Sequence, residues 1–394
     1  MERITCTVKG SKGSFGQGVF PRCLQRWHQR RTDGRTDRTA PSHSSDSAIH
    51  GRCSGPTGRC TVDIASSSEV LVMSLTSYQD ALKRINVNVR DGRASPHKLC
   101  MLLAVFDLAR AGVLTTNRVI FGPALLERYH QFFDAVRSPT DHANPYFPFF
   151  HLGGKLRGGQ ASFWHLKSLP GREAVAENMT TARSMAEITN NFAWAELDED
   201  LFHLLQQPAS LEALSTTLAT HWFDRGLQEL RQVVVRAGEV SRYEQRLRQA
   251  TPLTAAEAST PLYVRSPAFR RVVTEIYDYR CAASGIRLVL PSGESLVEAA
   301  HIHPFSEAGD DDPRNGLALT PDFHWAMDKH LIAPGPDLRW HVSPLLDERI
   351  ADHGRLVSLN GRSLILPSQS RFIPKQEALA WRLSRLRSRT SGEI

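Results

Sequence analysis

The sequence predicts an α+β protein: a mainly helical N-terminal domain with a small aromatic-rich strand region, followed by a C-terminal domain that combines a hairpin with a short helix. The chain has 394 residues, which exceeds one ordinary domain and favours two. Apolar residues recur at helical spacing through much of residues 73–250. Two strand-like runs flank the turn sequence PSGES, and a helical pattern comes after them.

Residues 1–72 differ from the rest of the chain, because Gly, Ser, Thr, Arg and Pro dominate them and apolar periodicity is nearly absent. Such a segment cannot bury enough surface to fold. Met73 is followed at once by a plausible domain start, SLTSYQDALKRI. We therefore expect residues 1–72 to be disordered or a mis-annotated extension, with Met73 as the native initiator. A genuine basic disordered arm is the alternative.

Residues 73–225 are expected to form the first domain. One helix is predicted between Pro96, which suits a first turn, and Gly112, which suits a stop. Its apolar residues at helical spacing are Leu99, Leu102, Leu103, Phe106 and Leu108. Further helices are predicted at 123–136, 173–190 and 197–219.

The segment NPYFPFFHLGGKLRGGQASFWHL (144–166) separates these helices. Its aromatic residues, prolines and glycines predict short strands and turns instead of a helix. We expect most of its aromatic side chains to lie in the domain core: Tyr146, Phe147, Phe149, Phe150, Phe163 and Trp164.

The second half of the chain predicts a linker and a second domain. Residues 223–250 are typical of one long charged helix, and residues 251–261 contain two prolines and few bulky side chains. We assign 226–261 as a helical linker and 262–394 as the second domain. That domain is expected to open with a helix near 267–279 and to end with one near 375–388.

Charge is segregated along the chain, although the net charge is only +7. Residues 73–172 carry a net charge of +7, and residues 173–222 carry a net charge of −7. A basic block of this size can neutralise several phosphates of a polyanion. A solvated surface is the alternative interpretation of the same charges.

Cysteine usage and hydropathy favour a soluble, cytoplasmic protein with no membrane partner. Only Cys100 and Cys281 lie outside the N-terminal segment, so no disulfide framework is expected. Residues 282–284 contain no second cysteine, which excludes a zinc-ribbon CxxC pair there. The chain contains no apolar run of membrane-spanning length and no apolar signal-like N-terminus.

The strongest functional signal consists of three segments in order: VEAAHIHPF (297–305), DDPRNGLAL (311–319) and PDFHWAMDKHLIA (321–333). His301 ends a strand-like run, and Asn315 follows in a polar turn fourteen residues later. His324 and Asp328 are four residues apart on a predicted helix, so both face one side. A pair at this spacing can hold one divalent cation.

These residue types match the needs of phosphodiester hydrolysis. A base must deprotonate water, and histidine titrates near neutral pH. A cation must neutralise the phosphate and stabilise the leaving oxygen. We predict His301 as the base, Asn315 as the residue that orients it, and His324 with Asp328 as metal ligands.

This arrangement resembles the ββα-metal HNH endonuclease family over about residues 268–345. The order AHI-x-P, N-G-L-x-L and H-x-x-x-D resembles one branch of that family. The resemblance implies a divalent metal cofactor (Mg²⁺ or Mn²⁺, with Zn²⁺ as a third option). Many members carry a metal-ligating Asp or His where this chain has Ala300. Glu298, two residues earlier on the same strand face, is one candidate to substitute, and water filling the ligand position is the alternative.

Other residues near these motifs are given structural roles. His303 lies on the strand face of His301, and a functional role and a structural role are equally compatible with that position. His330 is expected to be an ordinary helix-exit residue. Phe323 and Trp325 are expected to be core residues and not groups that stack on DNA.

A second resemblance covers the first domain. The segments SPHKLCMLLAVFDL (95–108), YFPFFHL (146–152) and FWHL (163–166) resemble the sulfur-binding domain of type IV, McrA-like restriction endonucleases. That domain recognises phosphorothioate DNA and precedes an HNH domain in the family. The resemblance implies an apolar cup and phosphate contacts formed by Tyr146, Phe147, Pro148, His151, His97, Lys98, Arg93, Lys155 and Arg157.

The sequence therefore predicts a modification-dependent endonuclease that acts on double-stranded DNA, with a homodimer as an option because restriction requires two strand cuts. A reader separated from the nuclease domain by a long helix predicts cleavage at a distance from the mark. Two alternatives stay open: an HNH endonuclease that reads another mark such as 5-methylcytosine, or a non-catalytic DNA-binding protein whose site has decayed at Ala300.

Overall fold

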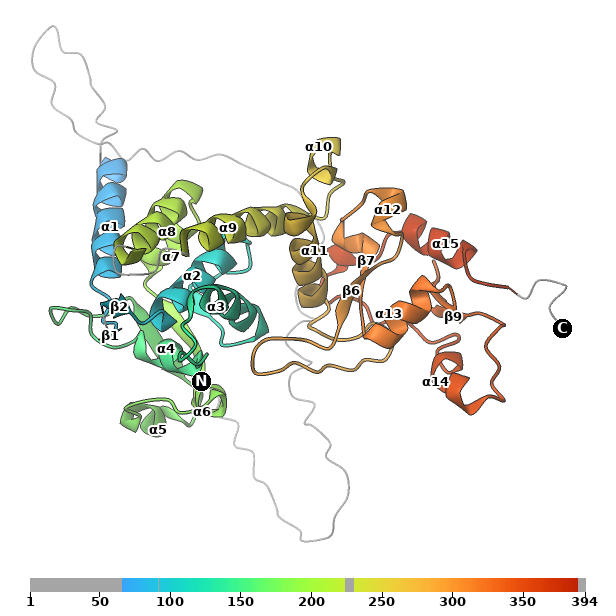
Figure 1. Ribbon diagram of the computed structural model, residues 1–394, viewed down its shortest axis with the longest axis horizontal. Helices are drawn as coiled ribbons and strands as arrows, with labels where there is room; N and C mark the ends of the chain where they lie inside the picture. The colour runs from blue at the N-terminus through green and yellow to red at the C-terminus, as the bar shows by residue number, and fades with distance from the viewer. Residues whose placement is uncertain (1–65, 91, 224–229, 389–394) are drawn as a thin grey trace, which may run out of the picture. The chain divides into compact units, whose positions relative to one another are not determined.

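The computed structural model describes residues 66–90, 92–223 and 230–388 (Figure 1). Their buried apolar side chains form two clusters, one between Ala81 and Ala237 and the other between Val240 and Leu379. Helices and small antiparallel sheets build both clusters, which confirms the α+β prediction. No described helix is long and apolar enough to cross a membrane.

The first cluster is mainly helical. Its helices are α1 (Ser66–Lys83), α2 (His97–Arg110), α3 (Pro123–Val136), α4 (Tyr146–His151), α5 (Glu173–Asn178), α6 (Met185–Asn191), α7 (Glu199–Leu205) and α8 (Pro208–Phe223). Its strands are β1 (Val89–Arg90), β2 (Arg93–Ala94), β3 (Arg118–Val119), β4 (Trp164–Ser168) and β5 (Phe192–Leu197). Strand β5 pairs antiparallel with β3 on one side and β4 on the other.

Helix α2 is the central element of this cluster, in contact with α3, α4, α8 and α9 (Figure 1). Every residue from Leu99 to Ala109 is buried, including Asp107, which is the pattern of a helix surrounded by protein. Both α2 and α3 occupy segments in which a helix was predicted, so these two predictions are confirmed.

The prediction that residues 144–166 contain no helix was wrong in part, because α4 occupies Tyr146–His151. Phe149 is fully buried against the core, and the Trp164 indole N–H donates to its carbonyl oxygen at 2.9 Å. Proline is compatible with the first turn of a helix, so the prolines of this segment do not prevent one. Burial of one aromatic face then favours a short helix here. The strand expected near Trp164 is present as β4.

The predicted long helix is α9 (Leu230–Leu247), and the predicted linker beyond it contains the single turn α10 (Ala255–Ala258). Thr254 and Glu257 form a reciprocal capping box at α10, which explains a helical turn in a segment poor in bulky residues. Ala237 of α9 belongs to the first cluster and Val240 to the second. Helix α9 therefore contributes to both cores.

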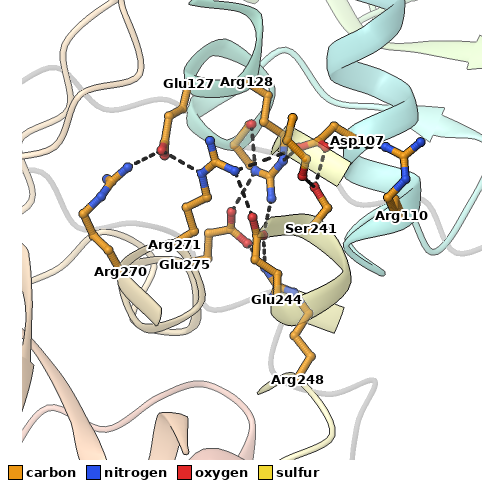
Figure 2. A network of polar contacts seen from close by, with 12 residues as sticks. Asp107, Arg110, Glu127, Arg128, Ser241, Glu244, Arg248, Arg270, Arg271 and Glu275 are labelled. Atoms are coloured by element: carbon orange, nitrogen blue, oxygen red, sulfur yellow. Dashed lines mark hydrogen bonds and ion pairs between the residues drawn. The ribbon is translucent and has the colours of Figure 1, made fainter. Parts of the chain in front are cut away.

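A buried network of charged side chains accompanies α9 (Figure 2). Arg128 of α3 is fully buried and forms ion pairs with Asp107 of α2, Glu244 of α9 and Glu275 of α11 (Leu262–Ile276). Arg271 of α11 pairs with Glu127 and Glu244, each at 2.9 Å. These contacts join helices of the first cluster to the first helix of the second.

The second cluster consists of α11 and the elements that follow it. They are β6 (Glu298–His301), α12 (Phe305–Ala308), η1 (Pro313–Asn315), β7 (Gly316–Leu319), α13 (Pro321–Asp328), β8 (Ile332–Pro334), β9 (Trp340–Val342), η2 (Ala351–His353), α14 (Gly354–Val357), η3 (Ser370–Phe372) and α15 (Gln376–Ser384). Strands β6 and β7 pair with each other, as do β8 and β9.

Two boundaries differ from the sequence predictions. Helix α11 begins at Leu262, five residues earlier than predicted, and its buried Val264 packs in the second core. The runs that flank PSGES meet only through single bridges such as Val289 with Ser295. The regular hairpin is instead β6–β7, whose strands are separated by the loop that carries Asn315.

The predicted N-terminal extension lies mostly outside the described residues. Helix α1 spans Ser66–Lys83 and therefore runs across the predicted boundary at Met73. The two cysteines of the body, Cys100 and Cys281, are both buried and free, in agreement with the expected absence of a disulfide framework in that part.

Candidate active site

The β6–β7 hairpin carries the first residues of the predicted site. In its antiparallel register Glu298 pairs with Leu319 and His301 with Gly316. Side chains alternate along a strand, so Glu298 and His301 lie on opposite faces of β6. Ala300, the residue just before the histidine, is completely buried, and its methyl side chain offers no ligand atom.

His301 is fixed by α11 and by the loop after α12. Its imidazole stacks in parallel on the ring of Phe269, with ring centroids 3.9 Å apart. Its Nε2 atom lies 2.9 Å from Oδ1 of Asp311. Gly316 permits this arrangement, because a Cβ atom there would lie 2.9 Å from the Phe269 ring and 2.6 Å from Val273.

Asn315 is buried and acts on the backbone beside His301. Its side-chain oxygen accepts from the His303 backbone N–H at 2.8 Å, and its amide nitrogen donates to the carbonyl oxygens of His303 and Asp310. The Ile302 backbone N–H donates to the Asn315 carbonyl oxygen at 2.8 Å. The described contacts of Asn315 therefore hold the backbone just after His301. They do not include the imidazole of His301.

The three candidate metal ligands lie together. Nδ1 of His324 is 2.9 Å from Oε2 of Glu298, and Nε2 of His324 is 3.5 Å from Oδ2 of Asp328. The side chains of Glu298 and Asp328 are each 53% exposed, so the group faces solvent. No hydrogen bond or ion pair among the described residues joins this group to His301.

Within residues 66–90, 92–223 and 230–388 no three His, Cys, Asp or Glu side chains are already arranged to hold a metal ion. Each ring nitrogen of His324 instead faces a carboxylate. Two carboxylates and one imidazole nevertheless form a donor set that suits Mg²⁺, Mn²⁺ or Zn²⁺. A cation would replace one of the two imidazole–carboxylate contacts.

Sequence reasoning missed Asp311. This residue is 2% exposed and is also approached by Arg265, whose Nη1 atom lies 3.3 Å from Oδ2, and by the Tyr243 hydroxyl at 3.5 Å. The only sequence signal was the acidic run Asp310–Asp312 just before Asn315, to which we assigned no role. The partners come from α9 and α11, which are far away in the sequence.

The neighbouring aromatic and histidine residues take different positions. His303 stacks on Trp381 of α15 with ring centroids 4.0 Å apart, and burial lowers the pKa of its imidazole. Phe323 is a core residue, as predicted, whereas the prediction for Trp325 was wrong because this side chain is 57% exposed. His330 follows α13 in a left-handed conformation and contacts Arg382.

A cleft of about 550 Å³ opens beside the Asn315 loop. His303, Asp310, Asn315, Lys375 and Trp381 contribute to its walls. Two of its charges are paired with each other, since Lys375 contacts Asp310 at 2.7 Å, and Lys375 also contacts Asp312 at 3.1 Å. A larger cleft of about 1050 Å³ lies between α3, α9 and α11, and none of the candidate nuclease residues lines it.

The candidate sulfur-cup residues gather at α4. Phe147 is 41% exposed, and its ring lies 4.2 Å from that of His151, measured between centroids. Pro148 is buried and Tyr146 packs against the first core. Burial lowers the pKa of His151, and the charge of nearby Lys98 lowers it further.

The candidate phosphate contacts bind backbone carbonyl oxygens of their own domain. Lys98 donates to Asn86 at 2.9 Å and Arg157 to Val87 at 3.2 Å. Arg93 donates to the carbonyl oxygen of Val136, and burial lowers the pKa of the Lys98 ammonium. These side chains thus tie loops together in the protein without DNA.

His97 follows the same pattern. One ring nitrogen contacts the carbonyl oxygen of His142 at 3.0 Å, and the other contacts the Ser95 hydroxyl at 2.9 Å. Its ring also packs on Phe133 of α3. Lys155, in contrast, is exposed.

Comparison with protein families gives a match over residues 281–333 to the family described as HNH endonuclease. Residues 281–333 are similar to an HNH endonuclease domain. The match lies inside the segment 268–345 that resembled this family by its motifs, and it includes Glu298, His301, Asn315, His324 and Asp328. The enzyme class predicted for the chain, a nuclease, is thereby confirmed.

Among solved structures, the chain is similar to one described as a modification-dependent TagI restriction endonuclease, with 22% sequence identity and a TM-score of 0.26. That alignment covers 32% of this chain and 40% of the other. No curated protein matches the chain.

Proposed function

We propose that this protein is a modification-dependent DNA endonuclease. Its HNH domain hydrolyses phosphodiester bonds with a divalent cation held by Glu298, His324 and Asp328, and with His301 as the base. The observation that carries this proposal is the meeting of two carboxylates on one imidazole, one from β6 and one from the same helix as the histidine. Glu298 and His324 are 26 residues apart, and their contact gives this histidine a second carboxylate besides Asp328, four residues further along its own helix.

A divalent cation at this group would neutralise the phosphate and stabilise the leaving oxygen. Glu298 supplies a carboxylate that Ala300 cannot, which favours an intact ligand set over a decayed one. His301 would accept the proton of the attacking water, and Asn315 would hold the backbone on which that histidine stands. The scheme needs no direct contact between His301 and His324, because the attacking water and the phosphate would lie between the base and the cation.

Plasmid cleavage tests the nuclease assignment. The full chain should cut modified DNA with Mg²⁺ or Mn²⁺ and should stop cutting when the metal is chelated. His301→Ala should lose cleavage by at least about a hundredfold while it keeps DNA binding. Equal cleavage by the wild type and His301→Ala would exclude the base assignment and favour a contaminating activity.

We further propose that the first domain, residues 73–225, reads phosphorothioate DNA. Sulfur is larger and more weakly hydrated than oxygen, so an apolar cup penalises an ordinary phosphate oxygen more than sulfur. The half-exposed Phe147 and the neighbouring His151 are suited to line such a cup, and Lys98 lies close enough to influence His151. The phosphate contacts would come from basic side chains of the same domain: Lys155, Arg93, Lys98 and Arg157.

Binding of the full chain to three matched duplexes tests the mark. Phosphorothioate, 5-methylcytosine and unmodified DNA should be compared without metal, so that no cutting interferes. Phe147→Ala should reduce the preference for phosphorothioate, whereas Val175→Ala, an exposed apolar position on α5, should not. If the protein preferred the methylated duplex, the first domain would be a reader of a modified base and not of sulfur.

The arrangement of the two cores along α9 favours cleavage outside the mark. Sequencing of the cut ends should place breaks at a distance from the modified dinucleotide. Breaks confined to that dinucleotide would contradict the separation of reader and nuclease domains.

A further inference from the structure

We infer that Asp311 is a positioning residue for His301, which it orients and holds in one tautomer. This inference rests on the proposed role of His301 as the base. Asp311 lies in the loop between α12 and η1, and its Oδ1 atom is 2.9 Å from Nε2 of the imidazole. Its side chain is only 3% exposed, whereas that of His301 is 25% exposed. The carboxylate therefore stands behind the imidazole, on its protein side.

The surroundings hold this carboxylate in place. Arg265 of α11 forms an ion pair with Oδ2 at 3.3 Å, and the Tyr243 hydroxyl of α9 lies 3.5 Å from the same atom. The Arg265 guanidinium is itself held over the Phe305 ring, 3.4 Å from its centroid. Both oxygens of Asp311 thus have partners, and only one of these partners is the histidine.

The contact determines which ring nitrogen can act as base. An ionised carboxylate only accepts hydrogen bonds, so the Nε2 atom that faces Asp311 carries the proton. Nδ1 is then left with its lone pair and can accept a proton from water. The stacked Phe269 ring fixes the plane of the imidazole, and Asp311 fixes its rotation within that plane.

Asp311→Asn should therefore lower kcat by at least about tenfold and leave KM nearly unchanged, because the amide can also stabilise the wrong tautomer. The matched control is Asp312→Asn. Asp312 is in the same loop and is equally buried, but it pairs with Arg314 and Lys375 and does not contact the imidazole. Urea denaturation of both variants measures the loss of stability that they share.

A double variant separates a positioning role from a purely structural one. In the His301→Ala background, Asp311→Asn should produce no further loss of cleavage, since residues that act as one unit are not additive. Asp312→Asn should reduce cleavage by the same factor in both backgrounds. If Asp311→Asn and Asp312→Asn lowered kcat equally, the positioning role would be overturned while the base assignment stood.

The tautomer can also be measured without a variant. Nitrogen-15 NMR of the histidine-labelled full chain should show His301 with its proton on Nε2. A proton on Nδ1 would overturn the role of Asp311 even if Asp311→Asn failed to fold. If His301→Ala instead cleaved DNA as fast as the wild type, the proposed base would be overturned, and with it the role of Asp311.

Discussion

The guanidinium of Arg128 in α3 forms a fully buried ion pair with the carboxylate of Glu244 in α9 (Figure 2). The next residue before Glu244 is Tyr243, which contacts Asp311 beside His301. Two adjacent residues of α9 thus contact the helical core on one side and the loop of the candidate active site on the other.

Arg128→Met should destabilise the protein by about 3–5 kcal/mol, because it leaves buried carboxylates without their partner. Urea denaturation would measure the change. Arg137→Ala is the control, since Arg137 pairs with Asp134 on the surface with both side chains about half exposed. That pair should contribute less than about 1 kcal/mol. Similar losses for the two variants would contradict a special role for the buried network.

The ion pairs of the Glu127 carboxylate should make an acid-sensitive contribution to the stability of the folded protein. Burial alone would raise the pKa of this carboxyl, but the charges of Arg271, Arg270 and Arg128 outweigh it and hold the pKa at about 2 instead of 4.5. Because the pKa of Glu127 is lower in the folded state than in the unfolded chain, the ionised carboxylate stabilises the folded protein at pH values above the unfolded-state pKa. This stabilisation is about 3 kcal/mol. The contribution should disappear as the pH falls from about 4.5 to 2.

Denaturation of the wild type and Glu127→Gln at several pH values would measure this contribution. The wild type should be the more stable protein at pH 7, and the difference should narrow below the ordinary glutamate pKa of 4.5. A difference that stays constant over this range would show that Glu127 does not act through its charge.

Asp328→Asn should weaken Mn²⁺ binding by at least about tenfold, because it removes a charged donor from the His324 group. Calorimetric titration of the full chain would measure the affinity. Asp337→Asn is a matched control, since Asp337 and His341 form another exposed pair four residues apart. If both variants bound Mn²⁺ as the wild type does, the proposed ligand set would be wrong.

Trp325→Ala should raise KM for DNA by roughly fivefold, which corresponds to about 1 kcal/mol of lost aromatic contact. Trp325 is 57% exposed and directly follows His324 in α13, so an exposed aromatic side chain lies on the same helix as two of the proposed metal ligands. Steady-state cleavage would measure KM, and the melting temperature should hardly change. Ile350→Ala, at another exposed apolar position, should leave KM unchanged.

Several elements followed directly from local sequence patterns. Helix α2 was predicted because its apolar spacing and its flanking Pro and Gly residues are local signals. Helix α4 was missed because its six residues are stabilised by burial of Phe149 and not by local propensity. The regular hairpin was misplaced to PSGES, since β6 and β7 pair across a long loop whose turn residues do not indicate which strands will pair.

The sequence by itself determined the residue types of a nuclease site and their order, because a catalytic motif needs particular side chains at particular spacings. Only the tertiary structure decided which of them touch. It placed Glu298 against His324, Asn315 on the backbone of His303, and Asp311 against His301. The position of Asp311 depends on its partners from α9 and α11, and the contact of Glu298 depends on packing of β6 with α13. Packing between separate segments leaves no local periodicity in a sequence.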